Sequence, residues 1–243
     1  DRLKNQQEKL IINERHEAWG SLARKLAHEI KNPLTPIQLT IDRLRSKYSN
    51  QLNEKNETNF RENLKIINNQ IKQIEKLVNE FSDFARMPKP IFQNNDLITL
   101  MNDNIKLLKE LDGSINIIFN RKIEKIFLNC DKEQLSRVFF NLIKNSIESI
   151  IEKAENHSNF NKKITIELND NNNHIELIID DTGIGFKNFE SNIKDILNPY
   201  FTTKKKGTGL GLSIVNKIVN DHNGNIEFLS KDDGAKIKII FLK

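Results

Sequence analysis

Two long apolar stripes in the first part of the chain constrain its fold more than any other feature of the sequence. In the first stripe, apolar residues recur three or four positions apart, the spacing of one face of an α-helix: Trp19, Leu22, Leu26, Ile30, Leu34, Ile37, Ile41, Leu44 and Tyr48. The second stripe alternates steps of four and three, as in a coiled coil or antiparallel bundle: Phe60, Leu64, Ile67, Ile71, Ile74, Val78, Phe81 and Ala85. The polar segment SNQLNEKNETN separates the stripes, so residues 19–86 are predicted to form a helical hairpin.

A single hairpin cannot cover both stripes with its own residues. Two copies of the hairpin can bury both by forming a four-helix bundle, and we therefore expect a homodimer. Residues 1–18 are predicted to be a helical lead-in from an upstream signalling region, with Leu3 and Leu10 seven positions apart.

The segment ARMPKP ends the second helix with two prolines, and residues 87–92 are predicted to be a hinge linker between two domains. Beyond it, residues 93–243 alternate between helical and strand patterns. The expected helices are DLITLMNDNIKLLKEL, residues 131–154 and GLSIVNKIVNDH, and the expected strands are INIIF, KIFLN, KITIEL, HIELIID, NIEFL and AKIKIIFL. This order predicts a mixed sheet backed by helices, an α+β sandwich.

Composition excludes several classes of protein. No apolar run approaches the length of a membrane span, and the first residues have neither an initiator Met nor a signal-peptide core, so we expect a fragment of a longer protein. The net charge of +5 is spread along the chain, which does not indicate nucleic-acid binding. The single cysteine, Cys130, excludes an internal disulfide framework and is typical of a reducing cytoplasm.

The segment HEIKNPLTP places a histidine just before two prolines inside the first predicted helix. At about 100° per residue, His28 lies roughly 180° from the apolar stripe and therefore faces solvent, together with Asn32 one turn later. Pro33 has no N–H group, so the carbonyl of Glu29 loses its helical partner and we expect a bend. A histidine beside a carboxylate can act as a nucleophile, although a lone exposed histidine is more often simply solvated.

Three segments of the second domain have the composition of a site for phosphates and a base. DDTGIG closes an apolar strand with an acidic residue and two glycines, and KKKGTGLGL places three glycines and several lysines before a helix, where free N–H groups favour an anion. NLIKNSIES puts Asn141 and Asn145 on one helical face, where amide oxygens could hold a hard cation. Each segment is a weak signal alone, but their order is specific, and it matches neither a Rossmann fingerprint nor a P-loop.

The order HEIKNPL, NLIKNSIES, DDTGIG, NPYFTTK and KGTGLGL resembles the histidine, asparagine, glycine and phenylalanine boxes of bacterial sensor histidine kinases, from about residue 19 to residue 243. The segments EAWGSLARKLAHEIKNPLTPIQLTIDRLRSKY and NPYFTTKKKGTGLGLSIV are most similar to the nitrogen-regulation, NtrY-like branch. The resemblance implies a multidomain kinase core. An α-helical hairpin (19–86) would form the dimeric four-helix bundle for histidine phosphotransfer, followed by a catalytic α+β sandwich (93–243) of the Bergerat, or GHKL, ATP-binding type.

The resemblance also implies roles for individual residues. His28 would accept the phosphoryl group, Glu29 would polarise it, and Asn32 would orient water for a phosphatase reaction. Asn141 and Asn145 would hold Mg²⁺ on ATP, Asp181 would accept the adenine amino hydrogen, and Gly183 and Gly185 would let the turn pass the base. A lid from Phe186 to Lys206 would cover part of the nucleotide. The residues that would contact its phosphates lie in this lid and just after it: Thr202, Thr203, Lys204, Lys206, Gly207, Thr208, Gly209, Leu210 and Gly211.

Three positions depart from the commonest pattern of the family. Ser146 stands where alanine is commoner, Thr182 where asparagine is frequent, and Asn198 where an acidic residue often precedes the Pro-Tyr pair. None of them is a core catalytic position, so the departures concern tuning of the site and not activity.

The function expected from this resemblance is ATP-dependent autophosphorylation on His28 and phosphotransfer to an aspartate of a response regulator, with phosphatase activity on that regulator. We expect no direct nucleic-acid partner and a location in the cytoplasmic portion of an inner-membrane-anchored bacterial sensor, attached through upstream segments. One alternative is a GHKL-type ATPase clamp, which leaves HEIKNP unexplained. Another is a catalytically inactive scaffold, for which we would expect substitutions at the motif residues of these boxes.

Overall fold

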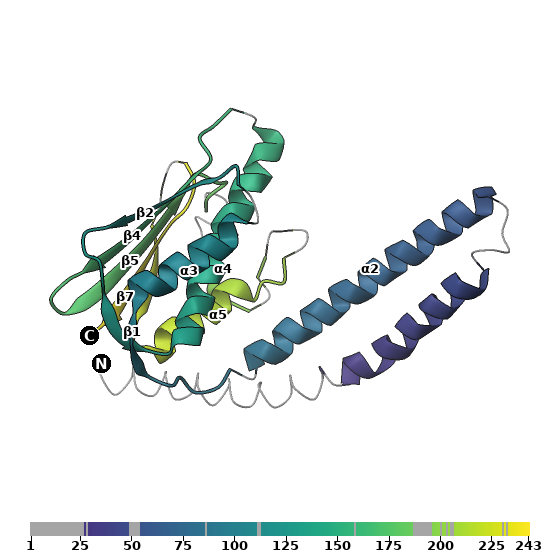
Figure 1. Ribbon diagram of the computed structural model, residues 1–243, viewed down its shortest axis with the longest axis horizontal. Coiled ribbons are helices and arrows are strands. Elements are labelled where there is room, and N and C mark those ends of the chain that lie inside the picture. The colour runs from purple at the N-terminus through teal and green to yellow at the C-terminus, as the bar shows by residue number, and fades with distance from the viewer. Residues whose placement is uncertain are drawn as a thin grey trace. The chain divides into compact units, whose positions relative to one another are not determined.

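The structure is a computed structural model that describes residues 27, 29–48, 54–85, 87–110, 113–157, 159–186, 196–199, 201–202, 204, 207–229, 231 and 233–243. The chain divides into two compact units, Asp1–Pro88 and Lys89–Lys243 (Figure 1). None of the helices in these described ranges is long and apolar enough to cross a membrane.

The first unit is a helical hairpin, as predicted. Its described helices are residues 29–48 and α2 (Glu54–Ala85). Leu34 and Ile41 of the first helix form one buried cluster with Leu64 and Ile71 of α2, and Phe60 packs against it. The buried residues are seven positions apart within each helix, so one of the two apolar positions of each heptad lies between the helices of the hairpin.

The other apolar position of each heptad remains exposed in the single chain. The exposed fraction is between 38% and 46% for five residues of the predicted stripes: Ile30, Ile37, Leu44, Ile67 and Ile74. An exposed apolar row of this length is what the predicted self-association would bury.

Both prolines of the HEIKNPLTP segment lie inside the helix, which continues from residue 29 to residue 48. Glu29 and Asn32 are exposed on it. His28 lies outside the described residues, as do Trp19, Leu22, Leu26 and the predicted lead-in of residues 1–18.

The second unit contains a five-stranded sheet in the order β2-β4-β5-β7-β6. Its strands are β2 (Asn116–Arg121), β4 (Lys163–Asp170), β5 (His174–Asp181), β6 (Asn225–Leu229) and β7 (Lys236–Leu242). The β2 and β4 strands pair parallel and the other pairs are antiparallel, so the mixed sheet expected from the sequence is confirmed.

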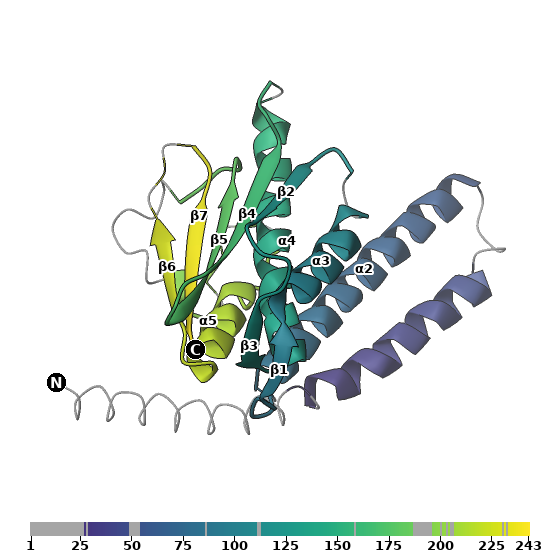
Figure 2. The same ribbon diagram turned by 60° about the vertical axis from the view of Figure 1, so that its left-hand side comes forward.

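Three helices cover one face of this sheet: α3 (Leu97–Lys109), α4 (Lys132–Asn156) and α5 (Gly211–Asp221) (Figures 1 and 2). Alternate strand residues are buried against them, including Ile175, Leu177 and Ile179 of β5. The opposite face carries polar side chains, with Lys238 paired to Glu176 at 3.0 Å. The sequence alternation therefore produces the two-layer α+β sandwich that was predicted.

A second, two-stranded sheet pairs β1 (Gln93–Asp96) antiparallel with β3 (Phe127–Cys130). The residues of β1, QNND, have low strand propensity, and no strand was predicted there. Side-chain hydrogen bonds hold it instead: Asn95 Nδ2 donates to the Cys130 carbonyl at 2.9 Å, and Asp96 caps the N-terminus of α3.

The end of the predicted linker is attached to the second unit. The N–H of Ile91 donates to the Asp131 carboxylate at 2.8 Å, and the Phe92 ring lies 5.1 Å from the His222 ring, measured between centroids. His222 Nε2 accepts the Asp131 N–H at 3.0 Å, so its Nδ1 carries the proton and donates to the Ile218 carbonyl at 2.8 Å. These contacts join the linker to the N-terminus of α4 and the C-terminus of α5.

Candidate active site

Asp181 is the last residue of β5 and lies on the face of the sheet that the helices cover. Only 3% of its surface is exposed. Its Oδ1 accepts the backbone N–H groups of Gly183 at 2.9 Å and Ala235 at 3.2 Å, and its Oδ2 accepts the hydroxyl of Ser146 at 2.8 Å. Burial raises the pKa of Asp181, and these hydrogen bonds and the charge of Lys231 only partly oppose that rise.

The turn after Asp181 requires glycine at two places. Gly185 has a φ of 78°, in the left-handed region, and a Cβ there would collide with the carbonyl oxygen of Gly234. Gly183 packs against Ser149 of α4 so closely that a Cβ would collide with its side chain. The turn is therefore pressed between α4 and the segment before β7.

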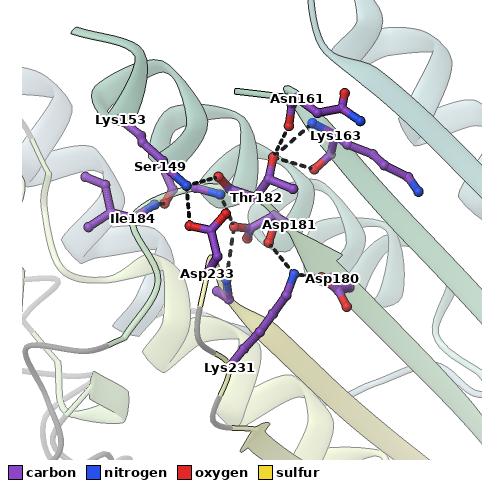
Figure 3. A network of polar contacts seen from close by, with 12 residues as sticks. Ser149, Lys153, Asn161, Lys163, Asp180, Asp181, Thr182, Ile184, Lys231 and Asp233 are labelled. Atoms are coloured by element: carbon purple, nitrogen blue, oxygen red, sulfur yellow. Dashed lines mark hydrogen bonds and ion pairs between the residues drawn. The ribbon is translucent and has the colours of Figure 1, made fainter. Parts of the chain in front are cut away.

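Two lysines donate to backbone carbonyls of this turn (Figure 3). Lys153 Nζ donates to the Thr182 carbonyl at 2.9 Å and pairs with Asp233. Lys231 Nζ donates to the Asp181 carbonyl at 3.1 Å and pairs with Asp180. Their charges lie beside the end of the strand that carries the buried carboxylate.

The α4 helix carries the predicted pair of asparagines, both half-buried. Asn141 Nδ2 donates to the Arg137 carbonyl at 2.9 Å, and its Oδ1 lies 3.6 Å from the position of a Cβ built on Gly211. Asn145 Oδ1 accepts from Lys204 Nζ at 3.4 Å, and the same ammonium group pairs with Glu148 at 2.6 Å. The ammonium group of Lys204 therefore already contacts side-chain oxygens on this face of α4.

This donor set fits a hard divalent cation. Asn141 uses its amide nitrogen within the helix, which leaves its oxygen directed toward the start of α5, and Asn145 already accepts from a cationic group. Amide oxygens are ligands that Mg²⁺ accepts, usually together with substrate phosphates. Among the described residues there is no cluster of three or more His, Cys, Asp and Glu side chains that could hold a metal by itself.

The glycine-rich segment leads into α5, whose first turn has no side-chain cap. Thr202 Oγ1 accepts the N–H of Lys204 at 3.1 Å, and Thr208 Oγ1 accepts the N–H of Leu210 at 3.5 Å. Gly209 has a φ of 70°. An uncapped helix N-terminus beside lysine and glycine residues suits a phosphate.

The structure thus brings together Asp181, Gly183 and Gly185 at one turn, and Asn141, Asn145, Lys204 and Gly211 around the start of α5. Thr203 and Lys206 lie outside the described residues, as does most of the predicted lid over residues 186–206. Glu29 and Asn32 belong to the other compact unit.

Several residues of the site were not predicted as site residues. Ser149 and Lys153 follow Asn145 at intervals of four on α4, and this spacing could have placed them on the same helical face. Lys231 and Asp233 reach the turn from the far end of the chain, and no local sequence pattern indicates that contact.

Comparison with known families identifies both parts of the chain. Residues 18–90 match the family model of the His Kinase A (phospho-acceptor) domain, and residues 130–243 match that of the histidine kinase-, DNA gyrase B- and HSP90-like ATPases. These matches confirm the Bergerat-type fold expected for the second unit.

The chain is 38% identical over 240 residues to an NtrY-like sensor histidine kinase of Rickettsia prowazekii, covering 98% of this chain and 38% of that protein. It is 35% identical over 226 residues to the nitrogen regulation protein NtrY of Azorhizobium caulinodans, covering 93% of this chain and 28% of that protein. The chain therefore spans well under half the length of these relatives.

A solved structure of the histidine kinase ThkA in complex with the response regulator protein TrrA has a TM-score of 0.65 and 24% sequence identity. The match covers 100% of this chain and 67% of that chain. At this level of sequence identity, the match shows that the two chains share a fold.

Gly185→Ala should destabilise the second unit, because alanine costs about 1 to 2 kcal/mol in the left-handed region and its Cβ would also collide with Gly234. Urea unfolding of the full chain, followed by circular dichroism, measures the loss. Gly113→Ala is the matched control, since a Cβ there meets nothing within 4 Å. Equal free energies of unfolding for the two variants would contradict the strain assigned to Gly185.

Proposed function

The chain belongs to the NtrY-like branch of the sensor histidine kinases, and on this premise we propose that it is the kinase core of a two-component sensor. In this role it transfers the γ-phosphoryl group of ATP to His28 and then to an aspartate of a response regulator. Members of this family are protein-histidine kinases, and the ATPase domain implies the use of ATP.

The observation that carries the proposal is the arrangement around Asp181. A buried carboxylate at one end of the site can accept the amino group of adenine, and the uncapped start of α5 at the other end can bind phosphates. The asparagines of α4 lie beside that helix start. An adenine nucleotide carries an amino group on its base and phosphates at its other end, so it matches both ends of the site.

At the phosphate end, the chain supplies N–H groups of the first turn of α5 and the ammonium group of Lys204. Asn141 and Asn145 would hold Mg²⁺, which when bound supplies positive charge that offsets the charge of the phosphates. The remaining contribution of the protein is to position the nucleotide and exclude water.

At the acceptor, we assign Glu29 to hold the proton of one imidazole nitrogen of His28, so that the other nitrogen keeps its lone pair for attack. The new N–P bond forms as the bond between the γ-phosphorus and its bridging oxygen breaks, and ADP leaves with that electron pair. The exposure of Glu29 is compatible with the approach of a nucleotide-binding domain from solvent.

The two rival functions account for less of the chain. An ATPase clamp would use the second unit alone and leaves the match of residues 18–90 to a phospho-acceptor domain without a role. An inactive scaffold would not need the hydrogen-bonded Asp181 turn or the polar groups beside α5.

The proposal includes two protein partners. A second copy of the chain would cover the apolar positions that the hairpin leaves exposed. A response regulator would dock on the phospho-acceptor domain, because that domain carries His28. ThkA, a histidine kinase with a similar fold, was solved in complex with a response regulator protein. We also place the chain in the cytoplasmic portion of a membrane-anchored sensor.

His28→Gln should abolish phosphoryl incorporation, because glutamine has no ring nitrogen with a nucleophilic lone pair. Incubation with γ-labelled ATP and Mg²⁺ measures retained label, which should be stable in alkali and lost in acid. The affinity for ADP should stay within about twofold, since the nucleotide residues lie in the other unit. His157→Gln changes an exposed histidine of the second unit and is the matched control. Full labelling of the His28 variant would refute the acceptor assignment.

Ile67→Asp should weaken the dimer, because it places a carboxylate on the apolar row that a second hairpin would cover. The expected result is a shift from dimer toward monomer in sedimentation velocity over a range of protein concentrations. Asn69→Asp introduces the same charge at an exposed position of α2 and should leave the distribution unchanged. A wild-type chain that sediments as a monomer at every concentration would rule the dimer out.

Asn32→Ala should slow dephosphorylation of the regulator while His28 labelling stays within a few-fold. The exposed amide of Asn32, one helical turn after His28, could orient a water molecule toward a phospho-aspartate. The measurement is the loss of label from a regulator phosphorylated beforehand by the wild-type chain. If labelling of His28 collapses in parallel, Asn32 has a structural role beside Pro33 instead.

A further inference from the structure

Ser146 is the one side chain among the described residues that donates a hydrogen bond to the Asp181 carboxylate. Its own surface is 3% exposed, and its hydroxyl donates to Asp181 Oδ2 at 2.8 Å. The other oxygen of the carboxylate, Oδ1, accepts from two backbone N–H groups. A carboxylate offers about four acceptor positions; the described residues fill three of them, which leaves one on Oδ2.

The position of Ser146 on α4 connects the two ends of the candidate site. It directly follows Asn145, and because successive helical residues differ by about 100° in direction, the amide and the hydroxyl face different surroundings. Asn145 contacts Lys204 near the start of α5, and Ser146 contacts the buried end of β5. Two consecutive residues therefore serve the phosphate end and the base end.

A buried carboxylate keeps its role as an acceptor only while it is ionised. Burial raises the pKa of Asp181, and the Ser146 hydroxyl is one of the groups that oppose this rise. A protonated Asp181 would instead donate a hydrogen bond, which suits a carbonyl oxygen and not an amino group.

We propose that Ser146 is a positioning residue for the nucleotide, which fixes the Asp181 carboxylate so that its one remaining acceptor position selects a purine with an amino group at C6. The proposal rests on the proposed nucleotide-binding function of this site. Guanine presents a carbonyl oxygen where adenine presents its amino group, so the same arrangement disfavours guanine.

The test is calorimetric titration of the full chain with ADP and with GDP in the presence of Mg²⁺, between about pH 5.5 and pH 8.5. Ser146→Ala should weaken ADP binding about 10- to 100-fold near neutral pH, the loss expected for one hydrogen bond to a charged group. The ratio of ADP to GDP affinity should fall with it.

The pH dependence separates positioning from a merely structural role. Loss of the Ser146 hydroxyl raises the pKa of Asp181 further, so ADP affinity should begin to fall at a higher pH in the variant than in the wild type. Among the described residues, two ion pairs lie around the turn, Lys231 with Asp180 and Lys153 with Asp233, and they are the same in both proteins. Dividing variant by wild-type affinity at each pH also cancels the titration of the nucleotide itself.

Two further variants keep the test decisive. Ser136→Ala removes a hydrogen-bonded hydroxyl of the same helix, which pairs with Asn104 and not with Asp181, and should leave ADP affinity and its pH profile unchanged. Ser146→Cys is similar in size with a weaker donor and should give an intermediate loss, a readout that remains if the alanine variant does not fold.

Each outcome decides the proposal. If the wild type prefers ADP but Ser146→Ala and Ser146→Cys match it at every pH, the Ser146 proposal is wrong and the nucleotide function stands. A loss that is equal for ADP and GDP and uniform across pH would also overturn it, because that is the signature of general destabilisation. If the wild type binds neither nucleotide, the proposed function fails together with this inference.

Discussion

The burial of the Asp181 carboxylate is the constraint on which the rest of the second unit depends. A carboxylate in an apolar core is costly unless donors surround it. One of those donors is local, the N–H of Gly183 in the same turn, and two come from distant parts of the chain, the hydroxyl of Ser146 on α4 and the N–H of Ala235 before β7. The turn, the helix and the closing strand must therefore assemble together for this residue to be accommodated.

The α4 helix alone supplies several of the contacts that hold the Asp181 turn. Ser146 contacts the carboxylate, Ser149 accepts the N–H of Ile184 at 2.9 Å, and Lys153 donates to the Thr182 carbonyl, so successive turns of one helix hold the chain from Asp181 to Ile184. Asn141 and Asn145 face the start of α5 from the same helix. Because side chains on one rigid helix keep fixed distances from one another, α4 fixes the separation between the proposed base contacts and the proposed phosphate contacts.

Much of this arrangement could be predicted from the sequence, and the reason lies in periodicity. The alternation of β5 places Ile175, Leu177, Ile179 and Asp181 on one face, so the depth of the carboxylate follows from a local pattern. The predicted stripes of the hairpin likewise include Leu34, Ile41, Leu64 and Ile71, which form its buried cluster. Patterns of this kind depend only on the geometry of a single helix or strand.

The remaining features depend on pairs of residues that are far apart in the sequence. The contact of Lys231 with Asp181, and the polar β1 strand held by Asn95, have no period to reveal them. From the sequence, Ser146 is distinguished only by standing where alanine is commoner in the family, since a hydroxyl on a helix has many alternative partners. Its role emerged from its distance to one carboxylate, which no local pattern contains.

The α5 helix also connects the candidate phosphate site to the predicted linker. Its N-terminus begins at Gly211, beside Asn141, and His222 at its C-terminal end contacts Phe92 and the N–H of Asp131. Both nitrogens of His222 are engaged, so the ring has a fixed tautomer and orientation. A shift of α5 along its axis on phosphate binding would carry His222 with it, and this movement would break the hydrogen bond to the Asp131 N–H and alter the packing of Phe92. Phe92, the last residue of the predicted linker, is thus in contact with the C-terminal end of the helix that would bind the phosphates.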